Sequence, residues 1–288
     1  GPTDRPKPLV DGALPRPGRG SPHVEPLRQR HPQPGHEGRI IAPHEYALPT
    51  DFKPFNIFAQ YAFLQKNDTL FNANGDEVPG SGSELLVGLS KYVRLWTPES
   101  NKNIGLAWEV IVPEIGIRDK ANMTSTGGFG DPITGFAAWY KPSSQWVLGT
   151  DLFVSVPVGD QAVGGGDRWD LLGSIFWDAQ YGKFNYTGNL GYHFNGSSAR
   201  GTEPGDYYHL NNRFGYRVSD LLEPYVGLDY QVTDGVVGAP ESNETALAAG
   251  MMFHLYDHAS IAVHYQKGID GESVAQSDSL NLRFVYVF

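Results

Sequence analysis

Alternation of apolar and polar residues organises the chain from Lys53 to its last residue. Along 184–195, aromatic, leucine and glycine residues at even positions alternate with Asn, Thr, Gly and His at odd positions. Successive side chains of a β-strand point to opposite faces, so this ribbon has one face suited to lipid and one suited to water. The stretch 280–288 repeats the pattern and stops on an aromatic residue, which is the usual form of the last strand of a bacterial outer-membrane β-barrel.

Twelve segments of this kind are predicted, separated alternately by short turns and by longer loops rich in Gly, Asp and Asn. They run to about 11–14 residues, longer than the roughly 5–6 of soluble strands and enough for the roughly 9–11 that cross a bilayer. The sequence therefore predicts an all-β protein, a transmembrane antiparallel up-and-down β-barrel of about 12 strands. The segments lie near 53–66, 83–96, 103–115, 128–140, 145–157, 167–179, 183–196, 206–217, 222–234, 243–255, 259–269 and 276–288.

Aromatic residues gather where the predicted strands meet the short turns. Amphipathic rings are favoured at the headgroup boundary of a membrane, so these residues are interpreted as one membrane girdle. Ordinary core aromatics are the alternative, but a core would not place them so regularly at one end. The girdle residues are Trp96, Trp139, Tyr140, Trp146, Trp177, Tyr216, Tyr225, Tyr256 and Phe288.

The first part of the chain differs from the rest. Residues 1–50 contain 11 of the 21 prolines and show no apolar period, so we expect an irregular Pro-rich segment, followed by the barrel over 51–288. Its seven Lys/Arg and five Asp/Glu give a net charge of +2, against −12 for the remaining residues. The segment is interpreted either as a flexible tail or as a piece packed in or against the barrel, which opposite charge would favour.

Composition narrows the function classes. The chain has no cysteine, which excludes disulfides and thiolate metal sites. An acidic body with net charge −12 lacks the cationic footprint of a nucleic-acid-binding protein. No stretch approaches 18 consecutive apolar residues, so no transmembrane helix is predicted. No signal peptide is present, and we expect the sequence to be a mature form if the protein is exported.

With the apolar faces assigned to lipid, the polar faces line the predicted lumen, because a basic residue on the lipid face costs up to about 2–4 kcal/mol at the midplane. These groups either form a static salt-bridge network or present charge to a moving solute. Phe58, Ile111, Phe136, Phe153 and Phe176 are assigned to the same faces, giving a mixed lining that suits amphipathic solutes. The polar lining residues are Asn56, Gln60, Glu84, Arg94, Glu109, Asp151, Asp170, Asp178, His193, His209, Arg213, Arg217, Asp229, His264 and Arg283.

Three other kinds of site are weighed and set aside. His193 with Ser197 and Ser198 invites comparison with twelve-stranded outer-membrane phospholipases, but nothing in the spacing secures a base beside a nucleophile. The Asn- and Asp-rich stretch 67–77 does not match the calcium-loop register and is expected to be a hairpin loop. The nine histidines show no metal-binding spacing, so no metal site is predicted. A soluble β-sandwich that binds a ligand is a third class of protein, beside the channel and the lipid hydrolase.

Two motifs and the closing strand resemble a known family. Gly128-Phe-Gly-Asp-Pro132, Phe153-Val-Ser-Val-Pro-Val-Gly-Asp160 and the final Phe-Val-Tyr-Val-Phe are similar to those of the outer-membrane channel family named for the meta-pathway of phenol degradation. The resemblance covers most of 50–288 and implies a small barrel that passes small, often hydrophobic or aromatic, molecules. It carries no catalytic residues across.

Together these features predict a passive, gradient-driven channel in the bacterial outer membrane, with a lipid hydrolase on the same barrel as the alternative. We expect a narrow pore and no enzymatic activity, cofactor or nucleic-acid partner. The expected partners are outer-membrane lipid, small-molecule solutes and the barrel-insertion machinery, which would engage the carboxy-terminal strand. A monomer is expected.

Overall fold

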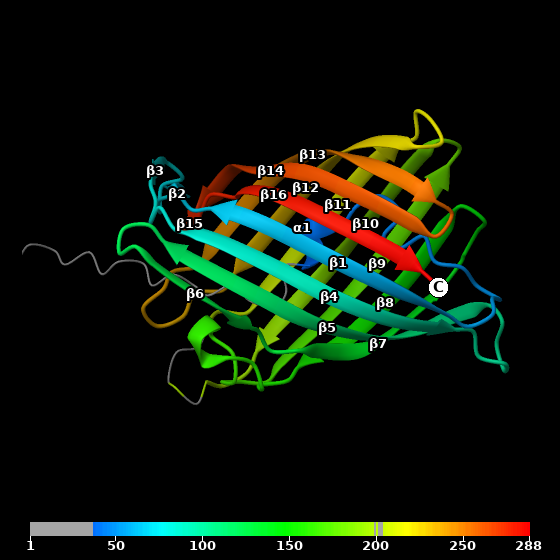
Figure 1. Cartoon of the computed structure of the whole chain (residues 1–288), viewed down its shortest axis with the longest axis horizontal. Coiled ribbons are helices and arrows are strands. Elements are labelled where there is room, and N and C mark those ends of the chain that lie inside the picture. Colours follow the sequence, from blue (N-terminus) through cyan, green and yellow to red (C-terminus); the bar gives the residue numbers. More distant parts are fainter. Residues whose placement is uncertain (1–36, 199, 201–203) are drawn as a thin grey trace, which may run out of the picture.

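The computed structural model describes residues 37–198, 200 and 204–288, so most of the predicted Pro-rich segment lies outside the described residues. The strands of the described chain form a closed ring and are tilted relative to its axis (Figure 1). No helix among the described residues is long and apolar enough to cross a membrane. The elements are α1 (Glu37–Ile40), β1 (Phe55–Lys66), β2 (Thr69–Phe71), β3 (Glu77–Pro79), β4 (Glu84–Trp96), β5 (Ile104–Asp119), β6 (Thr124–Phe129), β7 (Ile133–Tyr140), β8 (Trp146–Ser155), the 3-10 helix η1 (Gln161–Val163), β9 (Asp170–Tyr181), β10 (Phe184–Asn195), β11 (Tyr207–Tyr216), β12 (Leu222–Thr233), β13 (Ser242–Tyr256), β14 (Ala259–Glu272), β15 (Val274–Ala275) and β16 (Asp278–Val287).

Every neighbouring pair in the ring is antiparallel, and β1 closes it by pairing with both β4 and β16. β6 and β7 lie end to end along β5, so they count as one ribbon and the ring has twelve. The predicted all-β, twelve-stranded up-and-down barrel is therefore confirmed. The turns at 97–103, 141–145, 182–183, 217–221 and 257–258 form one rim, here called the short-turn end. The opposite rim is the long-loop end.

The ribbon predicted over 128–140 is interrupted at 130–132. Pro132 has no N–H to donate to the ladder, and the Gly130 N–H instead donates to the Pro113 carbonyl at 2.8 Å. The loop after β8 folds over this break. Asp131 Oδ1 accepts from the Gly159 and Gly166 N–H groups, each at 2.8 Å. The interruption is thus a built feature of the wall, and the two family motifs meet there.

A small three-stranded sheet of β2, β3 and β15 stands at the long-loop end, where the sequence predicts only a hairpin loop. The Asn72 side chain accepts from the Asn74 and Asp76 N–H groups at 2.9 Å. Gly75 follows with φ +83°, which an Asn-Gly turn requires. The stretch is therefore a hairpin with a local turn, although it forms strands of its own.

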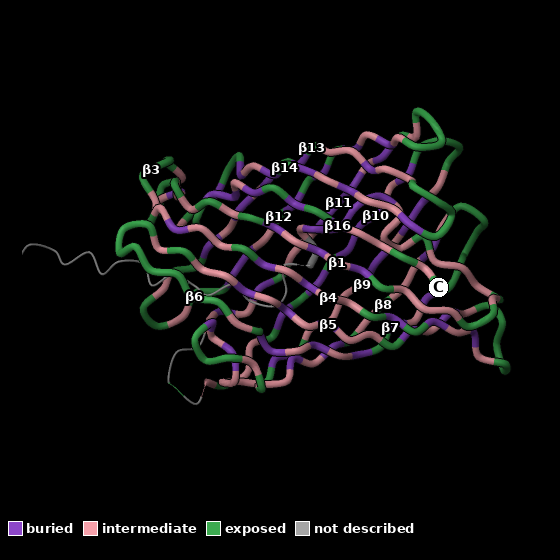
Figure 2. The backbone as a smooth tube through the Cα atoms, viewed as in Figure 1, coloured by how far each residue is buried: buried purple, intermediate pink, exposed green. Residues whose placement is uncertain are grey.

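Burial alternates along the ribbons, as the bands in Figure 2 show. On β16, Leu280, Leu282 and Tyr286 are exposed on the outer surface. Asn281 and Arg283 between them are buried. The outer surface is therefore apolar and the inner surface is closed to solvent, which is the pattern of a barrel whose wall lies in lipid.

Replacing Leu282→Arg should destabilise the folded barrel by about 2–4 kcal/mol in lipid vesicles, because a guanidinium would face hydrocarbon. The urea concentration at the midpoint of unfolding of the barrel in lipid vesicles measures this cost. Ser219→Arg, in a turn at the short-turn end, is the matched control and should change stability little. Equal stability of the two variants would show that the outer face of β16 does not meet lipid.

Candidate functional site

A segment of the chain lies inside the ring of strands. Residues 37–52, here called the inner segment, precede β1, and α1 is seen within the barrel in Figure 1. Ile40, Ile41 and Ala42 are 1%, 2% and 0% exposed. Such short apolar side chains are buried here because the barrel wall surrounds them on all sides.

One half of the lumen meets the inner segment with apolar side chains. Ile40 packs in a cluster with Tyr61, Leu89, Ile111 and others from β1, β4, β5, β7 and β8. Towards the short-turn end, Tyr46, Leu48 and Phe52 pack against a second cluster around Trp139 and Phe176. The Trp139 indole N–H also donates to the Pro49 carbonyl at 2.7 Å. This half is held by the hydrophobic effect.

The other half of the lumen meets the segment with buried polar groups. Arg213 on β11 is fully buried and forms a two-fold ion pair with Asp229 on β12, at 2.6 and 3.0 Å. Its other N–H groups donate to the carbonyls of Ile41 at 2.9 Å, Arg39 at 2.8 Å and Asn212 at 2.8 Å. Arg39 in turn lies 3.7 Å from Glu244. Arg213 therefore joins the wall to the backbone of the segment.

Glu45 of the inner segment connects the two strands that close the ring. Its Oε1 accepts from the Tyr61 hydroxyl of β1 at 2.6 Å, and its Oε2 lies 2.8 Å from Arg283 Nε of β16. All the charges in this contact are buried, so each depends on its partner.

Tyr46 stacks on Phe176 with the ring centroids 4.5 Å apart. Its hydroxyl accepts from the Asn189 amide at 2.7 Å. Burial is the main cause that raises the pKa of Tyr46 well above its ordinary value, with a further contribution from the nearby Glu45 carboxylate. The phenol therefore stays neutral at physiological pH.

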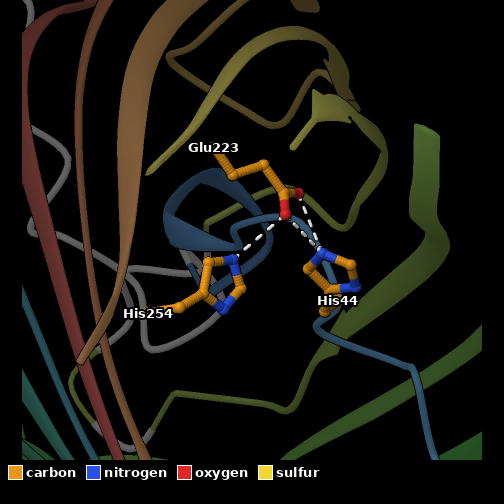
Figure 3. Close-up of side chains that lie close together, drawn as sticks. All are labelled: His44, Glu223 and His254. Carbon is orange, nitrogen blue, oxygen red and sulfur yellow. Dashed lines mark hydrogen bonds and ion pairs between the residues drawn. The ribbon is translucent and has the colours of Figure 1, made fainter. Parts of the chain in front are cut away.

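His44, Glu223 and His254 converge at the short-turn end (Figure 3). His44 Nε2 lies 2.7 Å from Glu223 Oε1, and His254 Nε2 lies 3.0 Å from the same oxygen. The sequence shows no metal-binding spacing because the three residues come from the inner segment, β12 and β13. The one available signal is the inward position of Glu223 on a ribbon that the alternation predicts.

The inner segment occupies the lumen beside a cavity of about 60 Å³, far below the roughly 300–1,000 Å³ of pockets that hold small molecules. Its lining combines apolar, aromatic and charged groups. They include Ile41, Glu45, Tyr46, Tyr61, Lys91, Asp151, Phe153, Leu172, Ser174, Asn189, His193 and His209.

Thirteen of the predicted lining residues lie on the inner face, in alternation with residues of the outer face. Several have ionic or polar partners there, as Glu109 has in Lys91 at 3.2 Å. His193 contacts Asp170 at 3.2 Å, and Tyr207 at 3.0 Å. The thirteen are Glu109, Ile111, Asp151, Phe153, Asp170, Phe176, Asp178, His193, His209, Arg213, Asp229, His264 and Arg283.

The assignment of β1 and β4 was wrong. Their buried residues, such as Ala59, Tyr61 and Leu89, face the inner segment, which places the alternate positions outside. The polar groups outside pair with each other on the outer surface. The residues that line the outside instead of the lumen are Asn56, Phe58, Gln60, Glu84 and Arg94.

Four further assignments on other ribbons are corrected. Phe136 is 62% exposed on the outer face, whereas Trp139, three residues later on β7, is 2% exposed in the lumen. Tyr225 is also buried inside and contacts His264 Nδ1 at 2.9 Å, so neither Trp139 nor Tyr225 belongs to a girdle. Arg217 donates to the carbonyls of the turn after β11 and lies at the rim.

The other predicted girdle residues lie on outward positions near the short-turn end. Tyr140, Tyr216, Tyr256 and Phe288 are exposed there. Trp146 donates to the Tyr181 hydroxyl at 2.8 Å across neighbouring strands on the same surface. The remaining members on outward positions are Trp96 and Trp177.

The residues considered for hydrolysis do not form a nucleophile and base. His193 uses its two ring nitrogens on Asp170 and Tyr207 inside the lumen. Ser198 Oγ donates to Asp167 at 2.5 Å in the loop region. An activated serine needs the base within hydrogen-bond reach, and these contacts do not supply one.

Comparison with solved structures places the fold. The COG4313 outer membrane channel from Pseudomonas putida F1 superposes with a TM-score of 0.72 at 17% identity, over 86% of this chain and 100% of that one. The beta domain of the Bordetella autotransporter Brka gives a TM-score of 0.51 at 12% identity, over 82% of this chain and 100% of that one. At such identities the likeness shows a shared barrel fold.

No curated protein sequence matches the chain. Residues 67–284, which include almost the whole ring of strands, match the family described as "Putative MetA-pathway of phenol degradation". The motifs at 128–132 and 153–160, from which the resemblance was inferred, meet at the interruption between β6 and β7. The chain therefore belongs to the phenol-degradation MetA-pathway family.

Proposed function

We propose that the protein is an outer-membrane channel for passive diffusion of small amphipathic, hydrophobic or aromatic molecules, with the inner segment as its internal restriction. The observation that carries this proposal is a closed barrel whose lumen is apolar on one half and polar on the other. A solute with an aromatic body and a polar group can meet both halves at once.

Two comparisons support the proposal. The description of the family names the degradation of phenol, an aromatic molecule with one polar group. A solved barrel of the same fold is an outer membrane channel. We further propose that the channel works as a monomer without a cofactor. Its exposed strand β16 would engage the insertion machinery, and no step of passage consumes energy.

The restriction follows from the size of the remaining cavity. About 60 Å³ admits a few water molecules but no aromatic solute, so the inner segment must shift for passage. The segment is held by apolar packing and by side-chain hydrogen bonds rather than by strand pairing with the ring. Such a segment can rearrange without breaking the hydrogen-bonded ring.

Flux into proteoliposomes tests the function. We expect phenol-sized aromatic solutes to enter faster than sugars of equal or larger size, and planar bilayers to show small conductance steps. Vesicles with heat-unfolded protein are the control. Electrical silence together with release of fatty acid from phospholipid would instead support the hydrolase, although His193 is engaged by Asp170 and Tyr207.

A further inference from the structure

Three side chains able to bind a metal ion meet at the short-turn end of the lumen. His44 comes from the inner segment, Glu223 from β12 and His254 from β13. One ligand atom from each lies within 4.8 Å of the other two. Figure 3 shows both imidazoles aimed at one carboxylate.

The donor set selects a class of ion. Two imidazole nitrogens and one carboxylate oxygen suit Zn²⁺ and neighbouring divalent transition metals, whereas Ca²⁺ and Mg²⁺ prefer oxygen ligands alone. A tetrahedral Zn²⁺ about 2.0–2.1 Å from each nitrogen holds its donor atoms roughly 3.4 Å apart. The observed distances from Glu223 Oε1 are 2.7 Å to His44 Nε2 and 3.0 Å to His254 Nε2. Small outward rotations of the two rings therefore make room for the ion.

The surroundings keep the ligands in place and accessible. The Glu223 side chain is 0% exposed, whereas those of His44 and His254 are 23% and 16% exposed. The carboxylate is thus fixed and the rings can be reached from solvent. Gly215 on β11 leaves the space that the carboxylate fills, because a Cβ there would collide with Glu223 Oε2 and lie 2.9 Å from Pro43 Cγ.

A second carboxylate stands behind the first. The His44 backbone N–H donates to Asn185 Oδ1 at 2.8 Å, and the Asn185 amide donates to Asp178 Oδ2 at 3.1 Å. Two carboxyl groups, those of Asp178 and Glu223, therefore lie close to this part of the lumen, an arrangement that favours a cation.

We propose that His44, Glu223 and His254 bind one divalent transition-metal ion of the Zn²⁺ class, and that the ion fastens the inner segment to β12 and β13. The three protein ligands leave a fourth position for water. The fastening matters for transport only if the proposed channel function holds, because it keeps the lumen closed. The metal site itself does not depend on that function.

Calorimetric titration with Zn²⁺ of the full chain, purified in detergent and stripped with EDTA, tests the site. We expect saturable binding at one ion per chain. His44→Ala and His254→Ala should each weaken it by at least about 100-fold, since even loss of a second-shell partner costs 10–100-fold. His258→Ala, an exposed histidine in the turn after β13, is the matched control and should bind as the parent does. Unchanged affinity in His44→Ala overturns the site.

The fastening is tested without any current measurement. Because the chain has no cysteine, Ala47→Cys at an exposed position of the inner segment accepts a single nitroxide label. Zn²⁺ should reduce the mobility of the label, EDTA should restore it, and the response should vanish when His44→Ala is added. A label indifferent to Zn²⁺ in a chain that binds it overturns the fastening. A responsive label in a chain that passes no solute overturns the channel function and leaves this proposal standing.

Discussion

Removal of residues 1–50 is expected to raise the conductance of the barrel several-fold. Eight strands close on a filled interior and 16–18 leave an open channel, so twelve enclose space that side chains of the wall alone do not fill. Here the inner segment occupies that space, and the cavity beside it measures about 60 Å³. Without the segment, water should enter along the polar half of the lumen. Single-channel recording in planar bilayers measures the change.

The matched control is a chain shortened by residues 1–36 only. It keeps the inner segment and its contacts with Arg213, Tyr61 and Trp139. We expect its conductance to equal that of the full chain. Both proteins should keep the heat-dependent gel mobility of a folded barrel. Equal conductance of the two shortened chains would show that residues 37–50 do not restrict the lumen.

Arg213→Leu should cost about 3–5 kcal/mol of stability, the largest loss expected from a single substitution. The change leaves the Asp229 carboxylate buried without its partner and removes the donors to the Ile41 and Arg39 carbonyls. Unfolding by urea in lipid vesicles measures the free energy of unfolding. Because the same group holds the inner segment, the variant should also conduct more than the parent.

Arg217→Leu is the matched control. This arginine lies four residues after Arg213, and its side chain donates to carbonyls of the exposed turn after β11. It should change stability by no more than about 0.5 kcal/mol. Arg213→Leu combined with Asp229→Leu should recover part of the loss, because a buried pair replaced by apolar groups is often tolerated. A loss of similar size in both arginine variants would contradict the role given to the buried ion pair.

The ring of twelve ribbons could be predicted because strand alternation is a local property. On β10, polar Asn185 and His193 alternate strictly with apolar Leu190 and Phe194, and the structure places the two sets on opposite faces. The sequence also showed where turns fall, since Gly, Asn and Asp gather there. Neither inference needs knowledge of what fills the lumen.

The errors on β1 and β4 have one physical cause. A water-filled lumen predicts polar Gln60 and Arg94 on the inner face. The inner segment instead presents Ile40 and Phe52 to these strands, so their apolar residues turn inward. Both faces of these ribbons carry apolar residues, so the alternation alone does not show which face is inside.

The cluster of His44, Glu223 and His254 could not be predicted from spacing. Its members are 179 and 31 positions apart, and only closure of the ring brings β12 and β13 beside the inner segment. The same holds for Glu45, whose partners lie on the first and last ribbons of the ring.

That last contact ties the filling of the barrel to its seam. From inside the lumen, Glu45 bridges β1 and β16, the first and last strands of the ring, whose pairing closes the barrel. Movement of the segment out of the lumen must also break the contacts of Glu45, and it leaves Arg283 without its counter-charge. Movement of the segment out of the lumen and loss of this side-chain bridge are therefore one coupled event, while the backbone pairing of β1 with β16 stays in place.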